Sequence, residues 1–140
     1  HEASVAILSD FTDIRILEYP PTDIRSLDFS LDGEYLFGSS WFYLYKWNIS
    51  DGKMEKIKTR HQGIIKTIQM SHDGQYIASI SRQTDRSVYF LHPETGNVVK
   101  RFQRHDLCGG YLKLSKMGHF LATTSDDASV RIWNLQNLIE

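Results

Sequence analysis

Apolar and polar residues alternate along short stretches of the chain, most clearly at 129–135, where Val130 and Ile132 flank Arg131. A period of two residues is typical of a strand with one buried face and one exposed face. The stretches are rich in valine, isoleucine, tyrosine and phenylalanine, and none shows a sustained apolar period of 3.6 residues. Because β-branched and aromatic residues favour strands, the pattern predicts an all-β fold.

The predicted strands fall into three successive groups, and two further strands at 4–9 and 13–19 precede them. The first group comprises the segments 24–30, 34–40, 42–49 and 53–59. The second group comprises the segments 64–71, 75–81, 87–92 and 98–103. The third group comprises the segments 111–115, 119–125 and 129–135.

The groups are copies of one repeat of 39 to 44 residues. When the copies are aligned on Trp133, the same position holds Leu91, Trp47 and Leu8. Two other markers share this period, namely the hairpin turns that contain Gly33, Gly74 and Gly118 and the Arg-His pairs at 60–61 and 104–105. Regular spacing of this length is the signature of a repeat architecture.

These repeats resemble those of the WD-repeat family of β-propellers, in which about 40–45 residues form one four-stranded blade. The resemblance covers nearly the whole chain. It implies that 3–19 are the last two strands of a preceding blade and that 22–60, 61–104 and 105–140 are successive repeats. The third repeat then lacks its outer strand, and the chain holds about three to three and a half antiparallel blades.

The resemblance also implies that the chain is the C-terminal portion of one larger propeller. A ring of this family usually closes when the N-terminal segment supplies the outer strand of the last blade. Because open blade faces and edges invite association, we expect the missing blades to come from another segment or chain.

By the same resemblance, the third blade should contain a buried hydrogen-bonded tetrad formed by His105, Ser125, Asp127 and Trp133. The aspartate would orient the histidine, which would bridge to the hydroxyl and through it to the indole N–H. Such a network holds the strands in register when every member is satisfied.

The other two repeats match the tetrad only in part. The second retains His61, Ser81 and Asp85 but has leucine in place of tryptophan. The first retains Trp47 but has Trp41 at the position of the turn aspartate. We therefore expect two of the three blades to lack a complete network.

Composition and charge restrict the class of function. The 140 residues are 41% hydrophobic and 24% charged, as in ordinary globular domains. A net charge of −1 gives no general attraction to nucleic acid or to anionic membranes. No apolar run approaches the roughly 20 residues that span a bilayer, and one cysteine cannot form an internal disulfide. We expect an intracellular protein, cytoplasmic or nuclear, without membrane contact.

Three patterns could indicate chemistry, and each has a simpler structural interpretation. Ser125, His105 and Asp127 are the residue types of a hydrolase triad, but the tetrad would enclose all three within a blade. The six histidines lack metal-ligand spacing, so neither a metal nor a cofactor is predicted. The segment 108–110, Cys-Gly-Gly, lacks the Lys-Ser/Thr of a phosphate loop and is expected to be a flexible connection.

The candidate partner-binding residues lie in turns and loops on the face that WD-repeat proteins commonly use for binding. Trp41 either projects as a binding hot spot or folds down to fill space, and the sequence leaves both alternatives open. The basic runs 56–60 and 100–104 could contact phosphate or protect sheet edges against pairing. The candidates are Trp41, Phe42, Arg60, Arg82, Arg86 and Arg104.

The predicted function is that of a non-catalytic scaffold that binds protein or peptide partners within a multiprotein complex. One alternative is a component of a nucleic-acid or ribonucleoprotein complex that uses the basic loops, which is not favoured. Another is part of a propeller enzyme whose catalytic groups lie outside this segment. The Trp-Asp-x-Arg motif of ubiquitin-ligase substrate receptors is absent, since Trp47 and Trp133 are both followed by asparagine.

Overall fold

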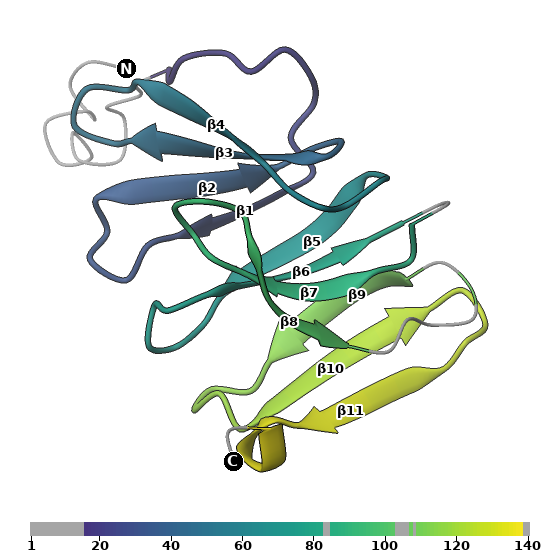
Figure 1. Cartoon of the computed structure of the whole chain (residues 1–140). Helices are drawn as coiled ribbons and strands as arrows, with labels where there is room; N and C mark the ends of the chain where they lie inside the picture. Colours follow the sequence, from purple (N-terminus) through teal and green to yellow (C-terminus); the bar gives the residue numbers. More distant parts are fainter. Residues whose placement is uncertain (1–15, 83–84, 103–106, 108, 139–140) are drawn as a thin grey trace, which may run out of the picture.

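The described residues form three antiparallel sheets that pack against one another in a row (Figure 1). The structure is a computed structural model that describes residues 16–82, 85–102, 107 and 109–138. The sheets contain four, four and three strands in the order of the sequence, and no α-helix occurs among the described residues. The predicted all-β fold class, with propeller blades of antiparallel strands, is confirmed.

The first sheet consists of β1 (Ser26–Phe29), β2 (Tyr35–Ser39), β3 (Tyr43–Asn48) and β4 (Met54–Lys58). The second consists of β5 (Ile65–Met70), β6 (Ile77–Ser81), β7 (Val88–Leu91) and β8 (Val98–Phe102). The third consists of β9 (Gly109–Leu114), β10 (Phe120–Ser125) and β11 (Val130–Asn134). A short 3₁₀ helix, η1 (Leu135–Leu138), follows the last strand.

Recurrent Ser-x-Asp-Gly turns join the first two strands of the first two sheets. In the first, the Ser30 hydroxyl donates to Asp32 at 2.6 Å, and Asp32 also accepts the backbone N–H of Glu34. Gly33 has a φ of 73°, which glycine adopts without strain. Gly74 has the same φ in the turn of the second sheet, so one local sequence produces the same hairpin twice.

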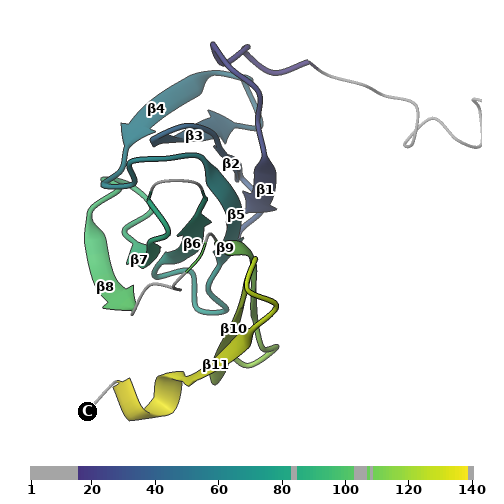
Figure 2. The same cartoon turned by 90° about the vertical axis from the view of Figure 1, so that its right-hand side faces the viewer.

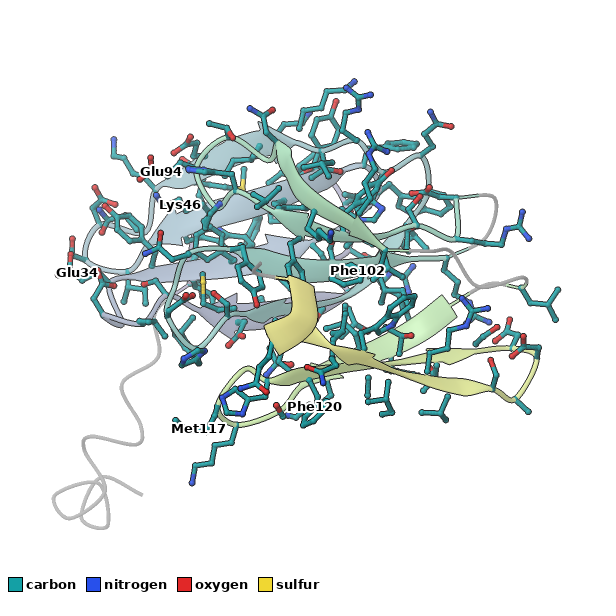
Figure 3. All side chains as sticks on the ribbon, turned by 60° about the horizontal axis from the view of Figure 1, so that its bottom comes forward. Glu34, Lys46, Glu94, Phe102, Met117 and Phe120 are labelled. Atoms are coloured by element: carbon teal, nitrogen blue, oxygen red, sulfur yellow. The ribbon has the colours of Figure 1, made fainter. Side chains whose placement is uncertain are left out.

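Adjacent sheets pack face to face through two apolar layers. Phe37, Leu44 and Ile57 of the first sheet meet one face of the second. Ile80 and Phe102 of the second sheet belong to the layer that meets the third. Figure 3 shows Phe102 at this layer and Phe120 on the opposite side of the third sheet. Both faces of the second sheet are therefore buried, as in a propeller blade between two neighbours.

The inner strands β1, β5 and β9 lie next to one another, as Figure 2 shows. Their side chains bond the backbone of the following sheet. The carboxylate of Asp28 accepts the N–H of Met70 at 2.7 Å, and the amide oxygen of Gln69 accepts the N–H of Leu114 at 2.7 Å. Asp28 and Gln69 occupy equivalent positions, so the same clamp joins each sheet to the next.

The expected strand at 13–19 needs correction. The expected strand at 4–9 and residues 13–15 lie outside the described residues, whereas 16–19 are described and form no strand. The N–H of Glu18 bonds the Gly52 carbonyl at 3.0 Å, and its own carbonyl accepts the Trp47 indole N–H at 2.8 Å. These bonds occupy the backbone groups that a ladder would use, so the segment crosses the end of the first sheet as a strap.

The expected flexible connection at 108–110 is also wrong for its glycines, which begin β9. Both glycines are buried. A Cβ atom on Gly109 would overlap with Cδ1 of Ile80 in the neighbouring sheet. Glycine is required at this point because the second and third sheets approach too closely for a side chain.

Candidate interaction surface and the polar network beneath it

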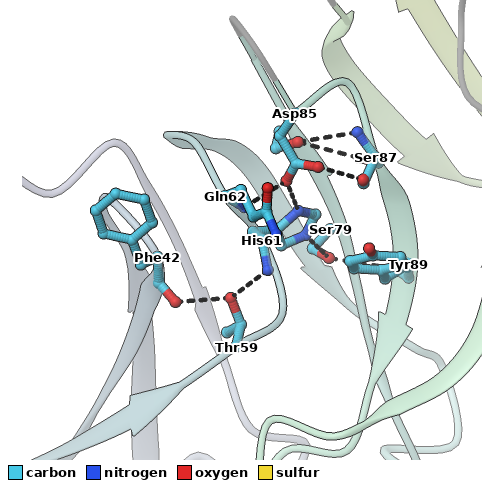
Figure 4. A network of polar contacts seen from close by, with 9 residues as sticks. Phe42, Thr59, His61, Gln62, Ser79, Asp85, Ser87 and Tyr89 are labelled. Atoms are coloured by element: carbon cyan, nitrogen blue, oxygen red, sulfur yellow. Dashed lines mark hydrogen bonds and ion pairs between the residues drawn. The ribbon is translucent and has the colours of Figure 1, made fainter.

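A buried polar network connects three parts of the second blade (Figure 4). His61 precedes β5, and its Nδ1 lies 2.8 Å from the carboxylate of Asp85, which is in the turn before β7. Nε2 of the same imidazole lies 2.7 Å from the hydroxyl of Ser79 on β6. In the neutral imidazole, Nδ1–H donates to the carboxylate and Nε2 accepts the hydroxyl proton. The network fixes the loop before β5 against the turn between β6 and β7.

Burial and hydrogen bonding keep this pair as a neutral histidine beside an ionised aspartate. Burial lowers the pKa of His61 below its ordinary value, although Asp85 opposes that effect. Burial alone would raise the pKa of Asp85, but hydrogen bonds from His61, Ser87, Ser81 and the backbone of Gln62 lower it far below its ordinary value.

The hydroxyl member of this network was assigned incorrectly from the sequence. Ser81 was expected, but Ser79 is the residue that contacts His61. Ser81 accepts the N–H of Ser87 at 3.0 Å and contacts Asp85 rather than the imidazole. Residues two apart in a strand point to the same face, so the alternation pattern cannot separate them. The pairing register between β6 and β7 places the earlier serine in the middle of the sheet.

The third blade shows the same displacement of two residues. The indole N–H of Trp133 donates to the hydroxyl of Thr123 at 3.4 Å, not to that of Ser125. Ser125 donates to the Leu107 carbonyl at 3.4 Å and accepts the N–H of Asp127 at 3.3 Å. The carboxylate of Asp127 accepts the N–H of Ser129 within the tight turn. The expected histidine of this blade, His105, lies outside the described residues.

The first blade has no hydroxyl at the equivalent position. Gly38 stands there, and the ring of Trp47 packs over it so closely that a Cβ would lie 2.8 Å from Cζ3. The indole therefore bonds the strap at Glu18 rather than a tetrad partner. Trp47 anchors the segment before β1, which corrects its expected place in a partial tetrad.

The turns between the second and third strands of each sheet share one feature, a non-glycine residue with a positive φ. Phe42, Arg86 and Ala128 occupy the same position and have φ values of 68°, 58° and 70°. All three turns lie at the same end of their sheets, together with the loop 59–63 that leads from β4 to β5. We call this end the turn rim. At this repeat position it carries a phenylalanine, an arginine and an alanine, each with a positive φ.

In the first blade, the aromatic turn is bonded to the loop 59–63. The N–H of Phe42 donates to the Gly63 carbonyl at 3.2 Å, and its carbonyl accepts the hydroxyl of Thr59 at 2.7 Å. The phenylalanine side chain remains 40% exposed. Trp41 is half-buried, and its backbone forms an isolated antiparallel bridge with Ile64.

The candidate arginines have different surroundings. Arg60 is exposed in the loop before β5. Arg82 is half-exposed, and its guanidinium pairs with Asp126 of the third blade at 2.9 Å, which links two neighbouring turns. Arg86 is half-buried, and Arg104 lies outside the described residues.

The described part of the chain contains neither a metal-binding cluster nor a membrane-spanning helix. No group of three or more histidine, cysteine, aspartate or glutamate side chains is placed there to hold a metal ion. No helix there is long and apolar enough to cross a membrane.

Comparison with known proteins agrees with the observed geometry. The family model described as WD domain, G-beta repeat matches residues 96–134. The chain is 28% identical over 130 residues to the Poly(A)+ RNA export protein of Schizosaccharomyces pombe, covering 89% of the chain and 36% of that protein. It is 28% identical over 125 residues to apoptotic protease-activating factor 1 of Rattus norvegicus, covering 89% of the chain and 9% of that protein.

A solved structure of the RRP9 WD40 repeats superposes with a TM-score of 0.75 and 22% sequence identity. The superposition covers 88% of this chain and 38% of that structure. The chain thus spans about a third of the length of the RNA export protein and of the RRP9 structure. The matched repeat, the stacked antiparallel sheets and the shared fold together support the WD-repeat β-propeller family that the sequence resembles.

Proposed function

We propose that this chain is part of a non-catalytic scaffold that presents its turn rim to protein partners within an intracellular multiprotein complex, in the cytoplasm or the nucleus. The observation that carries the proposal is the repeated turn. Phe42, Arg86 and Ala128 each have a positive φ at the same position of the repeat, and their side chains differ. A rigid framework with variable side chains is suited to recognition, because little ordering is needed on binding.

The buried network supports this role. His61 and Asp85 hold the loop 59–63 against the next turn, so the rim is organised before any partner arrives. The first candidate contacts are Trp41, Phe42 and Arg60. Arg82 contributes charge to the rim while it bridges to the third blade. Arg86 and Arg104 stay predicted contacts.

The two end faces of the stack support a larger assembly. Leu27 and Phe29 of β1 are exposed at one end, and Val130 and Ile132 of β11 are exposed at the other. Exposed apolar side chains grouped on a sheet face are typical of an interface. We propose that further blades, from another segment or chain, cover these apolar parts of both faces and leave the turn rim accessible.

A second candidate function is binding to nucleic acid through the basic loops that contain Arg60 and Arg104. The observation in its favour is the similarity to a protein named for poly(A)+ RNA export. Neutralisation of phosphates by arginine would make the affinity fall steeply as salt rises.

Partner recovery by the full-length protein, tagged in cells, tests both candidates. The rim variants F42A, R60A and R82A are compared with K53A and K116A, which change exposed lysines outside the rim. Quantitative mass spectrometry should show a common set of proteins lost only from the rim variants. Retention of every partner by the rim variants contradicts the proposal. Loss of all partners after ribonuclease treatment favours the nucleic-acid function instead.

A further inference from the structure

Two aromatic side chains and three cations form a continuous surface at the rim end of the first blade. The rings of Phe42 and Tyr43 meet edge to face with centroids 6.5 Å apart. Nζ of Lys56 lies 4.0 Å and Nζ of Lys58 lies 6.0 Å from the Tyr43 ring centroid. Phe42, Lys58 and Arg60 also line one shallow hollow with Thr59, His61 and Gln62. We call these five side chains, Phe42, Tyr43, Lys56, Lys58 and Arg60, the Phe42 surface.

The exposed ring at the centre of this surface has a fixed backbone. Phe42 has a φ of 68°, an uncommon conformation for a bulky residue, and three hydrogen bonds to the loop 59–63 maintain it. The residue is 40% exposed although its backbone N–H and carbonyl are hydrogen-bonded. An aromatic side chain held rigidly at the surface matches the anchor residues found at protein interfaces.

The positive charge of the surface is not neutralised within the described chain. Lys56, Lys58 and Arg60 are all exposed, and none forms an ion pair with a described residue. Glu55 pairs across the ladder with Lys46, so it lies on the opposite face of β4. Asp85 is close to the hollow, but its carboxylate is buried and accepts bonds from His61 and Gln62.

We propose that the Phe42 surface binds an extended acidic peptide, which places an apolar side chain on Phe42 and carboxylates beside Lys58 and Arg60. This proposal rests on the proposed scaffold function and assigns a chemical class to one of its partners. Complementary charge raises the association rate and orients the peptide, while the apolar contact supplies most of the affinity.

The aromatic geometry favours a peptide over single-stranded nucleic acid. Nucleic acid without base pairing binds by stacking successive bases on open ring faces above a basic groove. Here Lys56 covers the ring of Tyr43, so Phe42 is the one well-exposed ring of the surface. A single exposed ring is sufficient for one apolar side chain of a peptide but not for a run of stacked bases.

Fluorescence anisotropy with the full chain tests the proposal. The probe is a fluorescein-labelled heptapeptide of acidic residues around a central phenylalanine, and a second probe has alanine at its centre. We expect the phenylalanine probe to bind more tightly than the alanine probe. The double variant K58E/R60E should weaken binding of the phenylalanine probe at least about tenfold, because it reverses the complementary charge. F42A should remove the difference between the two probes.

The matched control is K53E/K116E, which makes the same change in net charge at two exposed lysines outside the surface. Its affinity should stay within about twofold of the unmodified chain, because distant exposed charges are screened by salt. Equal weakening by both double variants overturns the proposal, since general charge would then explain binding. Circular dichroism and thermal melts establish that each variant is folded, and F42G replaces F42A if F42A is not.

Fluorescein-labelled decauridylate is the competing probe. If it binds more tightly than the peptide and K58E/R60E abolishes its binding, the surface is a nucleic-acid site and the peptide assignment is wrong. If neither probe binds while rim variants still lose protein partners in cells, this inference fails and the scaffold function stands. If the peptide binds as expected but the rim variants keep every protein partner in cells, the scaffold function fails and the peptide site stands.

Discussion

His61 and Asp85 are joined by a 2.8 Å contact between Nδ1 and Oδ2 inside the second blade, and both side chains are buried. The contact links a loop that leaves the first blade to a turn 24 residues later. Because Asp85 also accepts the N–H of Gln62 at 2.9 Å, one carboxylate holds two groups of the same loop. The rim of the first two blades therefore depends on this carboxylate.

Replacing that carboxylate should destabilise the fold. In D85A the buried imidazole N–H and the N–H of Gln62 lose their acceptor, and each unpaired donor costs about 1–3 kcal/mol. We expect a total loss of about 3 kcal/mol in the free energy of unfolding, measured by urea denaturation. The control is D51A, which removes an exposed turn aspartate that caps the N–H of Lys53. Equal losses of stability in D85A and D51A would show that the buried carboxylate contributes no more than an exposed turn aspartate.

The same pair predicts how stability depends on pH. The pKa of His61 is lowered in the folded chain, so the unfolded chain takes up a proton first as the pH falls. The contribution of His61 to the free energy of unfolding should be fully present above the ordinary histidine pKa of about 6.5. It should decrease below that pH, with a limiting slope of about 1.4 kcal/mol per pH unit. The lowered pKa of Asp85 adds a further loss below the ordinary aspartate pKa.

Urea unfolding between pH 7.5 and pH 5 would measure this dependence, with the variant H61Q as the comparison. Glutamine cannot titrate, so the slope near the ordinary histidine pKa should be shallower in H61Q than in the unmodified chain. Parallel curves for the two proteins would assign the dependence to other groups.

Replacing Phe42 by glycine should remove its binding contact without destabilising the fold. Its φ of 68° costs a non-glycine residue about 1–2 kcal/mol, which glycine would avoid. Glycine also adds about 0.5–1 kcal/mol of backbone entropy loss, so F42G should be neutral or stabilising by up to about 1.5 kcal/mol. A128G changes the equivalent turn of the third blade and should behave similarly. A clearly lower melting temperature for F42G alone would show that the ring supports the fold by packing.

Because Gly109 lies close to Ile80, a smaller residue at position 80 should offset the destabilisation caused by a side chain at position 109. G109A introduces a Cβ into Cδ1 of Ile80 and should cost about 1–3 kcal/mol through overpacking. I80V alone should cost about 1 kcal/mol because it removes a buried methyl group. The double variant should be more stable than the sum of the two losses predicts, by about 1 kcal/mol or more. Strict additivity in urea unfolding would contradict the contact between the two sheets.

Much of the fold could be predicted from short-range patterns. The segment 42–49 was expected as a strand and β3 spans Tyr43–Asn48, and similar agreement holds for the strands of all three sheets. Alternation and Ser-x-Asp-Gly turns depend on neighbours only a few residues apart, so the sequence displays them directly. The repeat period then indicated how the sheets succeed one another.

The contacts of the candidate site could be predicted from the sequence less completely than the strands. Pairing His61 with Asp85 followed from the family resemblance, whereas the choice between Ser79 and Ser81 did not, because both face the same side of β6. The backbone bonds that hold Phe42 to the loop 59–63 join segments about 20 residues apart. No local pattern records them.

By itself, then, the sequence determined the strands, their turns and the repeat, because these arise from side-chain alternation and local backbone preferences. Only the tertiary structure decided that Ser79 and Thr123 are the buried hydroxyls, that Gly109 lies against Ile80, and that Trp47 holds the strap. The physical reason is common to all of these. Each depends on the register between strands or on the distance between packed sheets, and neither quantity exists until the chain has folded.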